Sequence, residues 1–105
     1  MSKISDQIME GMKTAMRAKD SVTLNTLRAL KTALTNAGIA KGGLGTPLEE
    51  AEELAVVRKQ IKQREDSMEQ FRSAGRPELA DKEEAEMIVL KQFMPAELTA
   101  EETAA

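Results

Sequence analysis

Serines, carboxylates and basic side chains are the groups in this 105-residue chain that could take part in chemistry. The chain has no cysteine and no histidine, so it lacks a thiolate nucleophile, a zinc–thiolate site and an imidazole base. Its serines lie at expected helix starts or inside helices, without a glycine-rich nucleophile turn: Ser2, Ser5, Ser21, Ser67 and Ser73. We therefore predict no catalytic residue and no cofactor.

Phosphate-binding and metal-binding patterns are also weak. The run Gly42-Gly43-Leu44-Gly45 lacks the lysine of a phosphate-binding loop and follows no expected strand, so we interpret it as a flexible linker. Glu83, Glu84 and Glu86 could offer oxygen ligands to Ca²⁺ or Mg²⁺. A solvated acidic helix is the simpler interpretation, and we predict no metal site.

Net charge is distributed unevenly along the chain, because acidic residues are concentrated after residue 45. Residues 1–45 have a net charge of +4, whereas residues 46–105 have a net charge of −7. Two oppositely charged halves that attract each other are the favoured interpretation, and a basic surface for RNA is the alternative. The candidate contacts are Lys13, Arg17, Arg28, Lys31, Arg58, Lys59 and Lys62. No aromatic residue lies between them, so they would grip phosphates rather than stack on bases.

A polar run, Lys62 to Ser67, contains a charged residue where an apolar one is expected. Arg64 falls on an apolar stripe of the surrounding helix. One hypothesis is that Gln63, Arg64 and Asp66 form a polar patch that docks a partner or a further domain. The favoured alternative is an ion pair between Arg64 and one of Glu83, Glu84 or Glu86, which would fix the register of two helices.

The elements that position these residues are predicted to be helices, because β-branched and aromatic residues are sparse. A first amphipathic helix should end near Lys19, and a second should begin at Asp20 or Ser21 and stop at Gly38. Thr46-Pro47-Leu48-Glu49 has the pattern of a helix start, with Thr46 as the cap and Pro47 in the first turn.

The remaining elements are two long helices joined by a turn at Gly75. The first has a heptad-like seam of Leu54, Val57, Ile61, Arg64, Met68 and Phe71. The second should run from Pro77 to Met94, with a facing stripe of Ala80, Glu83, Met87, Leu90 and Met94. We predict an all-α fold: a small helical bundle with an N-terminal helix pair packed on a long antiparallel helical hairpin.

The end of the chain carries another helix-start pattern, with Thr99 as the cap and Glu102 three residues later. We expect residues 1–98 to form one helical domain and residues 99–105 to be the truncated start of a further helix or C-terminal domain. Neither a membrane-spanning run nor a secretory signal is evident, so a cytoplasmic location is the default prediction.

Three stretches resemble the YqeY family. They are Lys62 to Ser67 continuing through Phe71 to Ala74-Gly75-Arg76, the run Leu90 to Pro95 with Leu98 and Thr99, and Met12 to Met16 continuing to Leu27-Arg28. The resemblance implies an N-terminal helical bundle, which this chain would represent, followed by a smaller C-terminal helical domain. That C-terminal domain is related to the tail of the B subunit of the aspartyl/glutamyl-tRNA amidotransferase and is missing here.

This resemblance also implies a function. We expect a non-catalytic accessory module associated with tRNA-dependent amidation or tRNA handling, with tRNA, a tRNA-amidation protein or the missing C-terminal domain as partner. One alternative is a component of a glutamine-dependent carbon–nitrogen ligase that is active only in a complex. Another is a helical protein–protein adaptor unrelated to tRNA. The sequence leaves the oligomeric state open.

Overall fold

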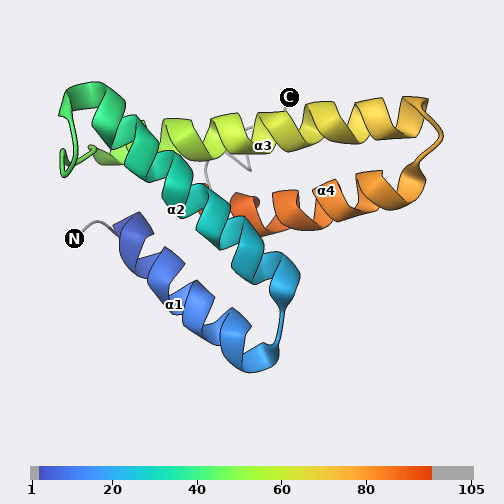
Figure 1. Ribbon diagram of the computed structural model, residues 1–105, viewed down its shortest axis with the longest axis horizontal. Coiled ribbons are helices and arrows are strands. Elements are labelled where there is room, and N and C mark those ends of the chain that lie inside the picture. Colours follow the sequence, from blue (N-terminus) through green and yellow to red (C-terminus); the bar gives the residue numbers. More distant parts are fainter. Residues whose placement is uncertain (1–2, 96–105) are drawn as a thin grey trace.

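Four α-helices make up the fold in the computed structural model, which describes residues 3–95. They are α1 (Lys3–Ala18), α2 (Ser21–Gly42), α3 (Glu50–Ser73) and α4 (Pro77–Lys91) (Figure 1). Residues 3–95 contain no strand. The all-α prediction is therefore confirmed, whereas the predicted helix start at Thr99 lies outside the described residues.

Helices α3 and α4 form the predicted antiparallel hairpin (Figure 1). Gly75 has a φ of 75°, the left-handed conformation that ends a helix, and Pro77 opens α4. Every member of the predicted α3 seam is buried or half-buried. Val57, Ile61 and Met68 join Met87 and Leu90 of α4 in one hydrophobic cluster.

The N-terminal helix pair, α1 and α2, turns sharply at Lys19, whose φ is 57°. Of the two predicted cap candidates, Asp20 caps α2, because its carboxylate accepts the Thr23 N–H at 3.1 Å and the Thr23 hydroxyl at 2.6 Å. A Cβ on Gly11 would lie 2.8 Å from Leu27 Cδ1, so the two helices pack closely at this point. Met16, near the C-terminal end of α1, is 59% exposed.

The predicted end of the second helix was wrong. Gly38 is buried inside α2, and the helix continues to Gly42 before Gly43 leaves it with a φ of 100°. A Cβ on Gly38 would come within 2.8 Å of the Thr46 carbonyl oxygen. Gly38 therefore permits the close approach of the α2–α3 connector, residues 43–49, rather than ending the helix.

The predicted start of the third helix was also wrong. Helix α3 begins at Glu50 with Glu49 as its cap, and Glu49 and Glu52 form the capping box. Thr46 and Pro47 belong to the connector instead. The Thr46 N–H donates to the Gly43 carbonyl at 3.1 Å, and the Thr46 side chain lies against Gly42.

Helix α2 crosses the hairpin and contacts both α3 and α4, whereas α1 packs mainly on α2 (Figure 1). Leu30, Val57 and Leu90 are the largest fully buried side chains, so the core lies where these three helices meet. The tip of the hairpin at Gly75 projects away from the N-terminal pair (Figure 1). Helix α4 ends at Lys91, three residues before the predicted Met94, and the chain then turns through Phe93.

Candidate functional site

Arg64 is the charged residue on the α3 seam, and its partner in α4 is Glu86. Arg64 Nε lies 3.4 Å from Glu86 Oε1, with the two side chains 13% and 17% exposed. Arg64 Nη1 donates to Gln60 Oε1 at 2.8 Å, but Arg64 Nε is buried and makes no hydrogen bond within the described part of the chain. The predicted interhelical ion pair is present, with Glu86 as the acid.

Glu83 lies beside this pair, one turn earlier on α4. Burial raises the pKa of Glu83, and the neighbouring Glu86 carboxylate raises it further, while Arg64 and Lys82 act in the opposite direction. Two carboxylates therefore compete for one guanidinium. The third acid of the predicted set, Glu84, is exposed.

Unlike Arg64, several other residues of the Lys62–Ser67 run are exposed. Lys62 Nζ lies 3.0 Å from Asp66 Oδ1, one turn away on the same exposed side of α3, and this hydrogen bond raises the pKa of Lys62. Gln63 is also exposed. The structure thus turns Arg64 into the hairpin and leaves Lys62, Gln63 and Asp66 at the surface, where docking of a partner stays a prediction.

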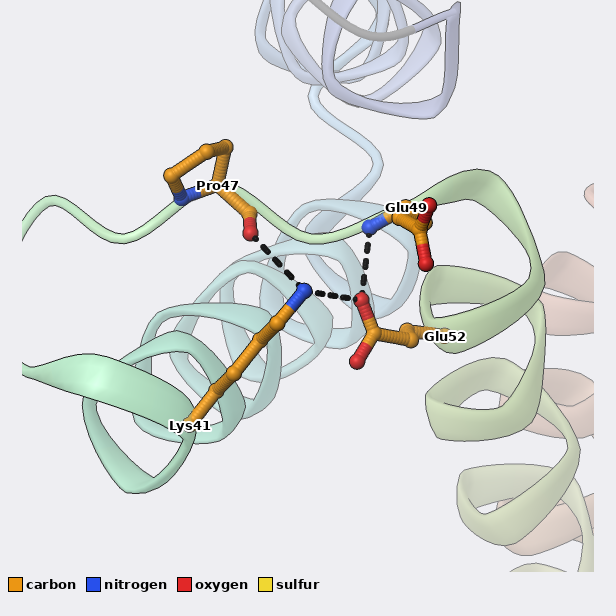
Figure 2. A network of polar contacts seen from close by, with 4 residues as sticks. All are labelled: Lys41, Pro47, Glu49 and Glu52. Carbon is orange, nitrogen blue, oxygen red and sulfur yellow. Dashed lines mark hydrogen bonds and ion pairs between the residues drawn. The ribbon is translucent and has the colours of Figure 1, made fainter.

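A polar network that sequence reasoning missed fastens the α2–α3 connector (Figure 2). Lys41 Nζ donates to Glu52 Oε1 at 2.6 Å and to the Pro47 carbonyl at 3.5 Å. The Glu49 N–H donates to the same Glu52 oxygen at 2.8 Å. These hydrogen bonds lower the pKa of Glu52, and the bond to Glu52 raises the pKa of Lys41.

One contact of this network could be predicted from residues that are close in the sequence, and another could not. The Glu49–Glu52 spacing of three residues is that of a capping box and was available in the sequence. Lys41 is eleven residues from Glu52, and nothing local pairs them. Lys41–Glu52 is an ion pair that joins the basic N-terminal pair to the acidic hairpin.

The candidate basic residues of the N-terminal pair lie on its surface. Lys13 is 3.9 Å from Glu10 on α1. Arg17, Arg28 and Lys31 are exposed and have no ion-pair partner among the described residues. The acidic half of the chain therefore does not neutralise most of these cations, and they are available to another molecule.

A cavity and two absences among the described residues also bear on binding. A cavity of about 230 Å³ lies where α1, α2 and the end of α4 meet, lined by Gln7, Gly11, Thr23, Leu27, Val89, Gln92 and Phe93. Within residues 3–95, acidic side chains do not gather into a group that could hold a metal ion. In the same range, no helix is long and apolar enough to span a bilayer.

Several known proteins are similar to this chain over most of its length. A protein of Pyrenophora tritici-repentis named "Altered inheritance of mitochondria protein 41, mitochondrial" is 33% identical over 87 residues, which is 83% of this chain and 46% of that protein. A Saccharomyces cerevisiae (strain YJM789) protein of the same name is 34% identical over 83 residues, 79% of this chain and 44% of that protein. The chain therefore spans less than half the length of these two relatives.

An uncharacterized protein of Schizosaccharomyces pombe is 35% identical over 92 residues, which is 88% of this chain and 69% of that protein. Residues 5–105 match the model of the family described as Yqey-like protein. The match covers α1 from Ser5 onward and all of α2, α3 and α4. The chain belongs to the YqeY family.

Proposed function

We propose that this chain is a non-catalytic accessory module that works in tRNA handling or tRNA-dependent amidation. The observation that carries the proposal is the set of exposed cations on α1 and α2 without ion-pair partners among the described residues: Arg17, Arg28 and Lys31. Phosphates are the natural partners of such cations, because binding releases the counterions condensed on the nucleic acid.

The acidic half of the chain supports the same proposal. Several of its cations have carboxylate partners close by, as in Lys62–Asp66 and Arg76–Glu78. A polyanion would be repelled by the hairpin and attracted by the N-terminal pair, so it would bind on one side of the molecule. The tRNA-amidation setting comes from the resemblance given above, in which the YqeY C-terminal domain, rather than the helices described here, is related to the amidotransferase B subunit.

The test is a filter-binding titration of tRNA at several salt concentrations. Replacing three cations by Arg17→Gln, Arg28→Gln and Lys31→Gln should weaken binding and reduce the slope of log K against log salt by about 2 to 3, since each phosphate contact contributes about 0.9. The matched control changes the charge equally on the hairpin by Arg72→Gln, Arg76→Gln and Lys82→Gln, and should leave the slope unchanged.

Three results would contradict the proposal. Equal losses in the two triple variants would mean that net charge alone governs binding. Absence of tRNA binding at low salt would favour an adaptor unrelated to tRNA. Release of ammonia from glutamine by the purified chain would favour the ligase alternative.

A cytoplasmic location, which is the default prediction from the residues, is a separate proposal. Two relatives carry mitochondrial names, so the mitochondrion is the alternative compartment. Fractionation of cells that express the tagged natural reading frame distinguishes the two compartments.

A further inference from the structure

Four of the cations on the N-terminal helix pair are exposed, and three of these are turned away from the core. At about 100° per residue, Lys13 lies about 140° and Arg17 about 180° round α1 from the buried Ile8. Arg28 lies about 160° round α2 from the buried Leu30. All three, like Lys31, are exposed. Their head groups can therefore reach a ligand without disturbing the packing of α1 on α2.

These cations also form a spaced series along the pair. Helices α1 and α2 are antiparallel and joined at Lys19 and Asp20 (Figure 1). Counted from the turn, the order is Arg17, Lys13, Arg28 and Lys31. At 1.5 Å per residue the series extends over about 14 Å.

The two helices that carry the series are packed closely on each other and on the hairpin. Gly11 and Leu27 bring the two helices into close contact, and the Asp20 cap fixes the turn between them. Ile8 and Leu27 lie in the main hydrophobic cluster, which anchors both helices to the hairpin. The cations therefore keep defined positions relative to one another, so a ligand that already holds its charges in a fixed array loses less conformational entropy on binding them.

Charge density then separates the forms of nucleic acid. A duplex of B-form DNA carries one charge per about 1.7 Å of axis and each of its strands one per about 3.4 Å, so a 14 Å length holds roughly eight charges on the duplex and four on one of its strands. A-form RNA duplexes are likewise recognised through phosphates, 2′-hydroxyl groups and shape. A cation series of this length therefore gains more from the duplex.

Binding of single strands usually depends on stacking of bases on aromatic side chains. Helices α1 and α2 contain no aromatic residue. The two phenylalanines of the chain, Phe71 and Phe93, are half-buried and pack against the hydrophobic cluster. The surface that carries the cations therefore has nothing on which an unpaired base could stack.

We infer that the α1–α2 surface recognises a double-helical RNA stem through its phosphate backbones and does not recognise unpaired bases. This inference rests on the proposed function, because it names the part of an RNA that the cations would contact. It predicts sequence-independent, salt-sensitive binding in which both helices of the pair take part.

The experiment compares three labelled RNAs by fluorescence anisotropy at one salt concentration. They are an intact tRNA, an RNA duplex of about 16 base pairs, and one strand of that duplex, whose sequence is chosen so that the strand does not fold on itself. About 16 base pairs is the length that a double-stranded RNA-binding domain spans. The duplex should bind at least about tenfold more tightly than the single strand. Changing the duplex sequence should leave its affinity unchanged within about twofold.

Paired variants test the series itself. Lys13→Gln with Arg17→Gln and Arg28→Gln with Lys31→Gln should each reduce the salt slope for the duplex by about 2. The matched hairpin pair, Arg72→Gln with Lys82→Gln, should leave it unchanged. If only one of the first two variants reduces the slope, the two-helix surface is refuted.

The outcomes distinguish this inference from the function on which it rests. If tRNA binds but the single strand matches the duplex in affinity, the duplex inference fails and the proposed function stands. If neither tRNA nor duplex binds at low salt, both fail. Duplex binding that is lost in both helix-pair variants and kept in the hairpin variant supports the inference.

Discussion

Arg64 and Glu86 face each other across the interface of α3 and α4, with Arg64 Nε 3.4 Å from Glu86 Oε1 and both side chains largely buried. The pair lies in a seam that is otherwise apolar, between Ile61 and Met68. Desolvation of a buried pair can offset its Coulomb attraction, so such a pair fixes alignment more reliably than it adds stability. Arg64 therefore acts as a register residue of the hairpin.

Removing Arg64 alone should destabilise the hairpin. Arg64→Met leaves Glu86 and the neighbouring Glu83 without their cation, and we expect the free energy of unfolding to fall by about 2 kcal/mol, less than the roughly 3–5 kcal/mol reported when fully buried pairs are broken. Urea denaturation followed by circular dichroism measures the change. Lys62→Met, which breaks the exposed pair with Asp66, is the control and should have little effect.

The double variant Arg64→Met with Glu86→Met should recover most of that loss, because it replaces both charges by apolar groups of similar volume. An Arg64→Met protein as stable as the wild type would mean that solvent, rather than Arg64, already satisfies Glu86. Unchanged tRNA binding in either variant would agree with a structural role for Arg64.

Glu83 should oppose folding at neutral pH. Its pKa in the folded protein is raised above 4.5 by burial and by Glu86. The folded state therefore holds the Glu83 proton at higher pH than the unfolded state does, and this carboxyl contributes a gain in stability as the pH falls through its folded-state pKa. Glu83→Gln should raise stability at pH 7 and remove that gain.

The measurement is the difference in unfolding free energy between wild type and Glu83→Gln from pH 7 down to about pH 4, just below the ordinary glutamate pKa. The difference should shrink as the pH falls. Glu84→Gln, at an exposed neighbouring position, should show no such trend. A difference that is constant with pH would contradict the raised pKa.

The buried seam and one cap were predictable because their signals are local. Seam residues such as Val57 and Ile61 repeat with the period of a packed helix, and that period alone selects their face. Asp20 accepts hydrogen bonds from a residue only three positions away. The choice of Glu86 among three candidate acids was not predictable, because it depends on the rotation of α4 against α3.

Errors at Gly38 and Thr46 have one physical cause. Both residues carry strong local signals, a helix stop and a helix cap, but the packing of the connector on α2 overrides them. A glycine inside a helix costs only about 1 kcal/mol relative to alanine, so close contact with another segment readily outweighs it. Long-range contacts of this kind, like Lys41–Glu52, leave no periodic trace in the sequence.

Gly38→Ala should destabilise the protein, although alanine normally favours a helix over glycine. The added Cβ would lie 2.8 Å from the Thr46 carbonyl oxygen, which belongs to backbone and cannot easily move. We expect a loss of about 1–3 kcal/mol, typical of overpacking. Gly42→Ala is the matched control, because its Cβ would meet the Thr46 side chain at 2.9 Å, and that side chain can rotate.

Thermal or urea unfolding of these two variants should therefore rank them in a fixed order. Gly42→Ala should be more stable than Gly38→Ala. The reverse order would show that the connector does not pack on Gly38 in solution.

Lys41→Met should loosen the connector while leaving the fold intact. Lys41 and Glu52 are each 39% exposed, and ion pairs at that exposure add little to global stability. Their contact nevertheless joins the last turn of α2 to the first turn of α3 across residues 43–49 (Figure 2). Amide hydrogen exchange should become faster at residues 43–49 and stay unchanged at the hairpin residues Val57 and Leu90. Lys41→Arg keeps the charge and should keep slow exchange, whereas equally fast exchange in both variants would mean that the connector is held by its backbone contacts alone.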